Sequence, residues 1–249
     1  RAWVMSRVRA VTWAKAAAHT AGLRGWERLG QLWQDVRRGL WGGLVASELL
    51  APASAAAVAG LALDPTALSR MVDAGAARLV PPAPTRLSFL APPQSPMGTP
   101  AAPRLGFTDE EQTDRVMGTL RNIGLLSGFS PLVIWMGHGS MSRNNPHLAA
   151  YDCGACSGRH GGPNARLFAA MANRPEVRAR LAERGLVIPE TTWFLGAEHN
   201  TADEAIDYYD LDLLPAALTP AFTTAKRALE HAARRSAQER CRKFEAAPR

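Results

Sequence analysis

The fold is decided by the segment PLVIWMGHGS, residues 131–140. Residues Pro131 to Met136 form a short apolar run, which is typical of a buried β-strand. The run ends abruptly in a polar, glycine-rich turn that contains His138. Ligands of α/β proteins gather at the carboxyl ends of parallel strands, so His138 lies where such folds usually carry their chemistry.

Helices are predicted on both sides of this strand. Before it, Thr108 and Glu111 have the spacing of a capping box, and the helix that they begin runs to about Asn122. After it, residues 164–184 have a helical pattern, which Pro175 should break or restart. This order of helix, strand and helix predicts the α/β fold class.

The remainder of the carboxyl-terminal half continues this pattern. Short strands are expected at residues 186–188 and 191–195, on either side of Pro189. Residues 219–244 are rich in alanine and arginine, which favour helix, and predict one long basic helix. We expect residues 107–249 to form a single α/β region.

Two other regions precede it. The first forty residues interleave tryptophans with basic residues at helical spacing, and we expect residues 1–79 to form a helical, basic region. Residues 80–106 carry prolines at a density that excludes helix interiors and central strands, so we expect a linker or surface loop. An apolar stretch at 42–63 contains Glu48 and Pro52, and we interpret it as part of a soluble helical pair, not a membrane span.

The composition indicates a basic globular protein. The chain has 249 residues, of which 47% are hydrophobic and 20% charged, and its net charge is +7. Such a charge suits nucleic acid, anionic lipid or an acidic partner alike, because all three attract cations. Three cysteines are too few for a disulfide framework and no signal peptide is visible, which favours a reducing, cytoplasmic setting.

Reactive side chains are concentrated just after the predicted strand. His138, His147, Asp152, Cys153 and Cys156 fall within twenty residues. Zinc prefers thiolate and imidazole ligands, so a histidine at a strand end and a cysteine in a glycine turn predict a zinc site.

The residues alone leave other interpretations open. The cysteines are also suited to small apolar packing positions, and Cys153-x-x-Cys156 has the spacing of a thiol redox pair, although no thioredoxin-like context surrounds it. Alternatively, the chain is a basic nucleic-acid-binding module with a structural zinc knuckle, whose tail from residue 226 contacts phosphate. No second Cys or His pair at finger spacing supports that alternative.

A family resemblance favours the zinc site. From Arg115 onward the sequence resembles the DabA family, the large subunit of bacterial energy-coupled inorganic carbon pumps. The matching motifs are Leu120–Leu125, Gly137–Ser140, Asn144–Pro146, Asp152–Cys156, Asn164–Arg166 and His199–Thr201. The resemblance implies a β-carbonic-anhydrase-like α/β core, here partial, with additional helical regions.

The resemblance also implies which residues bind Zn2+. Family members hold the metal with a histidine and a cysteine fifteen positions later, which correspond to His138 and Cys153, and Cys156 is then a neighbour. The Cys-x-Asp-x-Arg motif that supplies the family's other half-site is absent from this sequence. We therefore expect an internal fragment that carries half of the site and is inactive alone.

Five further residues are candidates for outer-sphere roles around this metal: Asn144, Asn145, Asp152, His199 and Asp203. His199 and Asp203 are four positions apart, so on a helix they would share a face. For the full-length protein the resemblance implies CO2 hydration by a β-carbonic-anhydrase-like mechanism, in which a zinc-activated water attacks CO2 and yields bicarbonate. It also implies a membrane-embedded, ion-translocating DabB-like partner, a peripheral location on the cytoplasmic side of the bacterial inner membrane, and no nucleic acid.

Overall fold

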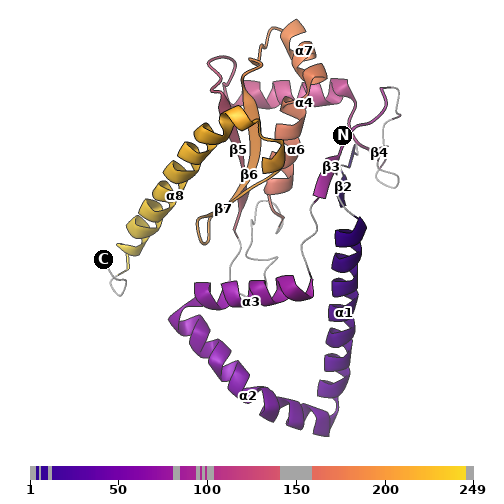
Figure 1. Cartoon of the computed structure of the whole chain (residues 1–249), viewed down its shortest axis with the longest axis vertical. Coiled ribbons are helices and arrows are strands. Elements are labelled where there is room, and N and C mark those ends of the chain that lie inside the picture. Colours follow the sequence, from indigo (N-terminus) through magenta and orange to yellow (C-terminus); the bar gives the residue numbers. More distant parts are fainter. Residues whose placement is uncertain are drawn as a thin grey trace. The chain divides into compact units, whose positions relative to one another are not determined.

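The structure is a computed structural model that describes residues 4–5, 7–10, 13–80, 85–93, 96, 99, 104–140 and 159–244. The chain divides into two compact units. One unit comprises Arg7–Ser88, and the other comprises Phe89–Arg249 together with Arg1–Ser6. Figure 1 shows the helices and strands of each unit.

The unit Arg7–Ser88 is mostly helical, as the spacing of its tryptophans predicts. Two short antiparallel strands join its ends, and three helices lie between them. These elements are β2 (Arg7–Ala10), α1 (Trp13–Arg38), α2 (Leu40–Leu63), α3 (Pro65–Leu79) and β3 (Thr85–Ser88). Asp64 caps α3, because its side chain accepts a hydrogen bond from the N–H of Ala67 at 2.8 Å.

The apolar residues of helix α2 are spread around its whole circumference, with Glu48 as its one charged residue, and only Ala46 within it is buried. Among the described residues it is the one helix that is long and apolar enough to cross a membrane by length and composition. A core helix of a soluble protein meets the same description, although such a helix is mostly buried. The soluble helical pair expected for this region stays a prediction.

The second unit contains a small mixed sheet with helices around it. Strand β5 pairs with β6 in parallel, and β6 pairs with β7 in antiparallel, so the order is β5-β6-β7. The elements are β1 (Val4–Met5), β4 (Arg104–Leu105), α4 (Asp109–Asn122), β5 (Leu132–Gly139), α6 (Gly162–Ala172), α7 (Pro175–Glu183), β6 (Trp193–Asn200), β7 (Ala205–Tyr208), the 3-10 turns η2 (Leu211–Leu213) and η3 (Ala216–Leu218), and α8 (Thr219–Cys241). The α/β fold class is confirmed at this level.

The capping box predicted for α4 is present. The Thr108 hydroxyl accepts from the N–H of Glu111 at 3.3 Å, and the Glu111 carboxylate accepts from the N–H of Thr108 at 2.9 Å. Gly124, just beyond the helix, has φ +77°, a conformation that glycine adopts without steric cost. The sequence signals at both ends of this helix are therefore confirmed.

The predicted break at Pro175 is also confirmed, since α6 ends at Ala172 and α7 begins at Pro175. The strand expected at residues 186–188 was wrong. Leu186 and Ile188 are buried, but Pro189 starts a turn in which its carbonyl accepts from the N–H of Thr192 at 3.0 Å. Strand β6 therefore begins only at Trp193.

Helix α6 covers one face of the sheet and buries Ala165, Phe168, Ala169, Met171 and Ala172. Phe168 stacks on Trp135 of β5 with ring centroids 4.0 Å apart, and it meets Phe194 of β6 edge-on at 6.0 Å. Such aromatic pairs add to the free energy gained by burial. The sheet and α6 thus share an aromatic cluster.

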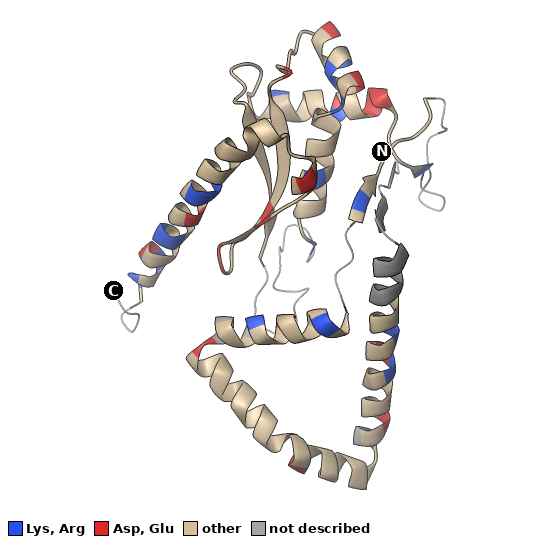
Figure 2. Cartoon of the chain, in the orientation of Figure 1, with Lys and Arg blue, Asp and Glu red and all other residues tan. Residues whose placement is uncertain are grey.

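Helix α8 lies on the opposite face. Phe222 packs edge-on against Tyr208 of β7 at 5.1 Å, and Ser236 bonds to the turn between β6 and β7. Acidic residues interrupt the basic residues along α8 (Figure 2), and Lys226 and Glu230 form one intrahelical ion pair at 3.9 Å. The long basic helix predicted at residues 219–244 is confirmed, and it ends at Cys241.

Candidate functional site

The carboxyl ends of β5 and β6 bring two histidines side by side. His138 and His199 are register partners in the parallel ladder, so their side chains leave the sheet on the same face. The His138 side chain is exposed, and His199 is half-buried. His199 borders a cavity that it shares with Met136, Leu229 and Ser236, which identifies this face as the one that α8 covers.

The imidazole of His199 is held by Glu204. Its Nε2 donates to Glu204 Oε2 at 2.5 Å, while the other carboxylate oxygen accepts from the Ser236 hydroxyl at 3.1 Å and pairs with Arg240. Burial alone would raise the pKa of Glu204, but the hydrogen bonds from His199 and Ser236 and the charge of Arg240 outweigh burial and hold that pKa below its ordinary value. Glu204 therefore keeps its charge at neutral pH.

On the face of the sheet that α6 covers, the buried carboxylate of Glu198 accepts hydrogen bonds from three donors. His160 Nδ1 donates to Oε1 at 2.7 Å, and the N–H of Gly162 donates to Oε2 at 2.8 Å. The Tyr209 hydroxyl donates to Oε2 at 3.5 Å. Gly162 is in the first turn of α6, where the helix dipole also favours a negative charge.

Glycines allow these groups to approach the end of β5. A Cβ on Gly162 would lie 2.2 Å from both Glu198 Oε2 and the Tyr209 hydroxyl oxygen. A Cβ on Gly139 would lie 2.9 Å from Glu198 Oε1, and one on Gly161 would lie 2.7 Å from the backbone nitrogen of His138. Only glycine fits at these close approaches, which explains why the segment around His138 and the start of α6 are glycine-rich.

Tyr209 remains a neutral donor in this cluster. Burial, and next the negative charge of Glu198, raise the pKa of Tyr209 to about 12. Its phenol is therefore protonated across the physiological range.

The structure describes three of the seven residues predicted for the site. His138, His199 and Asp203 lie within the described residues, and Cys153, Asn144, Asn145 and Asp152 lie outside them. Residues 199–203 are not helical, because β6 runs to Asn200 and a turn follows. Asp203 stabilises this turn by accepting from the N–H of Ala205 at 3.0 Å, and the carboxylate that holds His199 is Glu204 instead. The helical pairing of His199 with Asp203 was therefore wrong.

Three residues of the site were not singled out from the sequence: His160, Glu198 and Glu204. A signal for Glu198 exists, because it directly follows the apolar run of Phe194 to Ala197, where a charge must be paired if it is buried. No local pattern links it to His160, which is 38 positions away.

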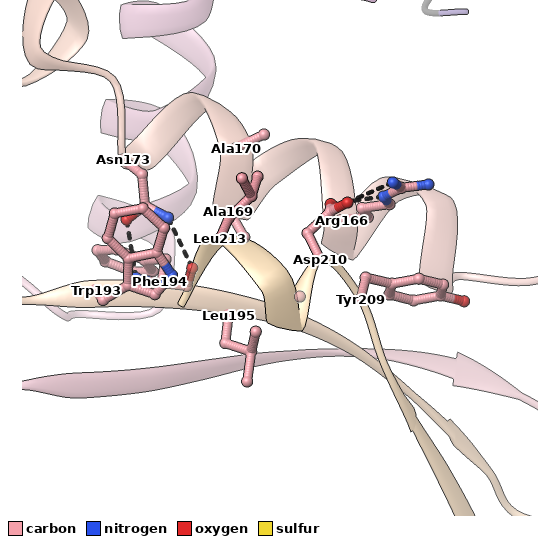
Figure 3. A pocket seen from close by; sticks show the side chains of 11 residues that line it. Arg166, Ala169, Ala170, Asn173, Trp193, Phe194, Leu195, Tyr209, Asp210 and Leu213 are labelled. Carbon is pink, nitrogen blue, oxygen red and sulfur yellow. Dashed lines mark hydrogen bonds and ion pairs between the residues drawn. The ribbon is translucent and has the colours of Figure 1, made fainter. Parts of the chain in front are cut away.

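A small cavity between α6 and β6 is a separate feature (Figure 3). Its polar groups are already paired with each other. Arg166 binds Asp210 through two hydrogen bonds of 2.7 and 2.5 Å, and the Asn173 side chain exchanges two hydrogen bonds with the backbone of Phe194. These pairs therefore hold α6 against the strand.

Across the part of the chain that the structure describes, no three His, Cys, Asp or Glu side chains are grouped as a metal site requires. His138 alone presents an exposed imidazole at a strand end. One such side chain fits a single position in a zinc coordination sphere, and three or four ligands are usual. The described residues therefore offer at most part of a metal site.

The fold and these side chains define an α/β protein with a polar, histidine-bearing site at the carboxyl ends of two parallel strands. The family described as “Probable inorganic carbon transporter subunit DabA” matches residues 3–249. The chain belongs to the DabA family.

Curated relatives carry the same description. A protein of Nitrosococcus oceani named “Probable inorganic carbon transporter subunit DabA” is 50% identical over 88% of this chain and 19% of its own length. Proteins with that name from Methylococcus capsulatus and Dechloromonas aromatica are 51% identical over 87% of the chain and 58% identical over 66%. These matches cover 20% and 16% of the relatives themselves. The chain thus spans about a fifth of the length of the curated relatives it matches, and no solved structure matches it.

Proposed function

We propose that this chain contributes half of a zinc site to a subunit that takes up inorganic carbon. The proposed ligands are His138 and Cys153. The observation that carries the proposal is the position of His138, whose exposed imidazole stands at the carboxyl end of a parallel strand. The names of the relatives, which describe an inorganic carbon transporter subunit, support the class of substrate.

The other ligands would come from a strand beside β5. The run Leu132, Val133, Ile134 and Trp135 is continuously apolar, which is typical of parallel strands covered on all sides. Yet β5 is at the edge of the sheet that the described residues form, and these four residues are only half-buried. A further parallel strand at this edge would cover them and would bring its own carboxyl end next to His138.

His199 is proposed to support His138 from the neighbouring strand. The two side chains share a face, and Glu204 orients the His199 ring. Groups that orient or neighbour metal ligands in this way tune both affinity and reactivity. Outer-sphere roles for Asn144, Asn145, Asp152 and Asp203 stay part of the proposal.

A bound zinc ion would supply the Lewis acidity that activates water for attack on CO2. The proposed reaction is CO2 hydration of the β-carbonic-anhydrase type, on a β-carbonic-anhydrase-like core, and half a site would leave this chain inactive alone. The proposed partner is a membrane-embedded, ion-translocating, DabB-like subunit. With such a partner the protein would be peripheral, on the cytoplasmic side of the bacterial inner membrane, and would bind no nucleic acid.

The test is the zinc content per polypeptide of the complete subunit, measured by elemental analysis. Near-stoichiometric zinc that is lost in both His138→Ala and Cys153→Ala would support the proposal. Cys156→Ser is the matched control, because a thiol redox pair would need this residue and the proposed zinc site would not. Zinc retained in both alanine variants would contradict the proposal.

A further inference from the structure

Glu198 is connected to the backbone of His138 by two consecutive peptide groups. The Glu198 carboxylate accepts from the N–H of Gly162, and the preceding N–H, that of Gly161, donates to the carbonyl of His138 at 2.8 Å. The same carboxylate accepts from His160 Nδ1. Both ends of the segment 160–162 are therefore bonded to Glu198, and its middle residue, Gly161, is bonded to the residue proposed as a zinc ligand.

The segment 160–162 is closely packed against the end of β5 as well as hydrogen-bonded to it. A Cβ built on Gly137 would lie 2.4 Å from the carbonyl carbon of Gly161, and one built on Gly161 would lie 2.9 Å from the carbonyl oxygen of His138. A displacement of residues 160–162 would thus move the His138 backbone directly. Among the strands that the structure describes, β6 is the one that pairs with β5 at His138.

We propose that Glu198 is a positioning residue for the metal ligand His138, acting through Gly161 and Gly162. This inference rests on the proposed function. It adds a residue from the opposite face of β6, which touches neither metal nor substrate and fixes the direction in which the His138 imidazole leaves the strand. Removal of such supporting groups typically weakens metal binding about 10- to 100-fold.

Glu198→Gln is the informative substitution. A glutamine side chain keeps the shape of Glu198 but replaces one acceptor oxygen with an NH2 donor. Either His160 or Gly162 then faces a group that no longer accepts its hydrogen bond in the present arrangement. Glu198→Ala removes both acceptors, and its effect should be larger.

Asp210→Asn is the matched control. Asp210 also neutralises a basic side chain of the α6 region, Arg166, but it has no contact with Gly161 or His138 among the interactions described above. Both variants lose one carboxylate that braces the same helix. Only Glu198→Gln disturbs the connection to His138.

Two readouts separate positioning from simple destabilisation in the complete subunit. The zinc dissociation constant, measured by competition with a chromophoric chelator, should rise about tenfold or more in Glu198→Gln and stay unchanged in Asp210→Asn. The visible absorption bands of the cobalt-substituted protein, which report ligand geometry, should shift only in Glu198→Gln.

The outcomes also separate the two proposals. Zinc bound equally well by the unsubstituted protein and Glu198→Gln, or weakened equally in both variants, would overturn the positioning role and leave the proposed function standing. Zinc that is absent from the unsubstituted protein, or insensitive to His138→Ala, would overturn the proposed function and this inference with it.

Discussion

Glu204 has a backbone conformation that is uncommon for glutamate, with φ +60°. This residue lies in the turn between β6 and β7, and its carboxylate accepts a hydrogen bond from His199 Nε2. Ser236 and Arg240 of α8 hold the carboxylate from the other side. One residue thus connects the histidine-bearing strand end to the carboxyl-terminal helix.

The lowered pKa of Glu204 predicts a pH-dependent contribution to stability. Its pKa is lower in the folded than in the unfolded chain, so the folded state binds fewer protons and stability rises with pH in that range. The contribution is complete above the unfolded pKa, about 4.3, and is lost as pH falls through the lower folded value. The stability lost in Glu204→Gln, measured by thermal unfolding between pH 3 and 7, should therefore be largest near neutrality and should shrink below about pH 4.

Glu239→Gln is the control for this titration. Glu239 is exposed on α8, the helix whose Ser236 and Arg240 contact Glu204. Its effect on the unfolding temperature should be small at every pH. A loss in Glu204→Gln that stayed constant down to pH 3 would show that the carboxylate charge is not what stabilises the turn.

At the residue scale, the sequence predicts which residues lie at the site better than it predicts which side chains they contact. His138 and His199 could be singled out because glycine turns and polar motifs mark them locally. The pairs that hold the site, Glu198 with His160 and Glu204 with Arg240, join residues 38 and 36 positions apart. Such contacts depend on how the strands and helices pack, and no periodicity within one segment encodes them.

Helix α4 shows how residues within one element stabilise it. Its capping box satisfies backbone donors that the first turn leaves without intrahelical partners. Thr108→Ala should therefore cost about 1 kcal/mol in the free energy of unfolding. Urea denaturation of the second unit would measure this cost.

Thr119→Ala is the internal comparison, since Thr119 is in the interior of the same helix and its hydroxyl only bonds back to the carbonyl of Arg115. Alanine favours helix more than threonine does, so this substitution should be neutral or slightly stabilising. Equal losses in the two variants would rule out capping as the cause.

At the element scale, sequence signals that act within a few residues were sufficient to predict the helices. The capping box, the break at Pro175 and the long helix over residues 219–241 all follow from local chemistry. Strand β5 was predicted correctly from its apolar run, but the burial expected with it was wrong: residues 132–135 are only half-buried, because burial depends on neighbouring strands. The expectation of a strand at residues 186–188 failed for a related reason: Leu186 and Ile188 are buried by packing without joining a ladder.

At the scale of the whole molecule, the unit Arg7–Ser88 leaves much of its apolar surface in contact with solvent. The exposed fractions are 84% for Leu40, 75% for Leu49 and 86% for Leu63. Monomeric soluble proteins rarely expose large contiguous apolar patches, and each exposed Å2 forgoes roughly 25 cal/mol of burial free energy. Because α1, α2 and α3 bury little of their apolar surface, another surface that covered them would stabilise them.

This exposure predicts self-association of the chain when it is purified alone, because a second copy then offers a matching apolar surface. Sedimentation velocity should show species larger than a monomer at micromolar concentration, and the double substitution Leu44→Gln and Leu49→Gln on α2 should shift the distribution toward the monomer. Leu90→Gln with Leu213→Gln, which changes exposed leucines of the other unit, should leave the distribution unchanged. A monodisperse monomer in the unsubstituted chain would mean that α1, α2 and α3 cover one another in solution far more completely than their exposed side chains indicate.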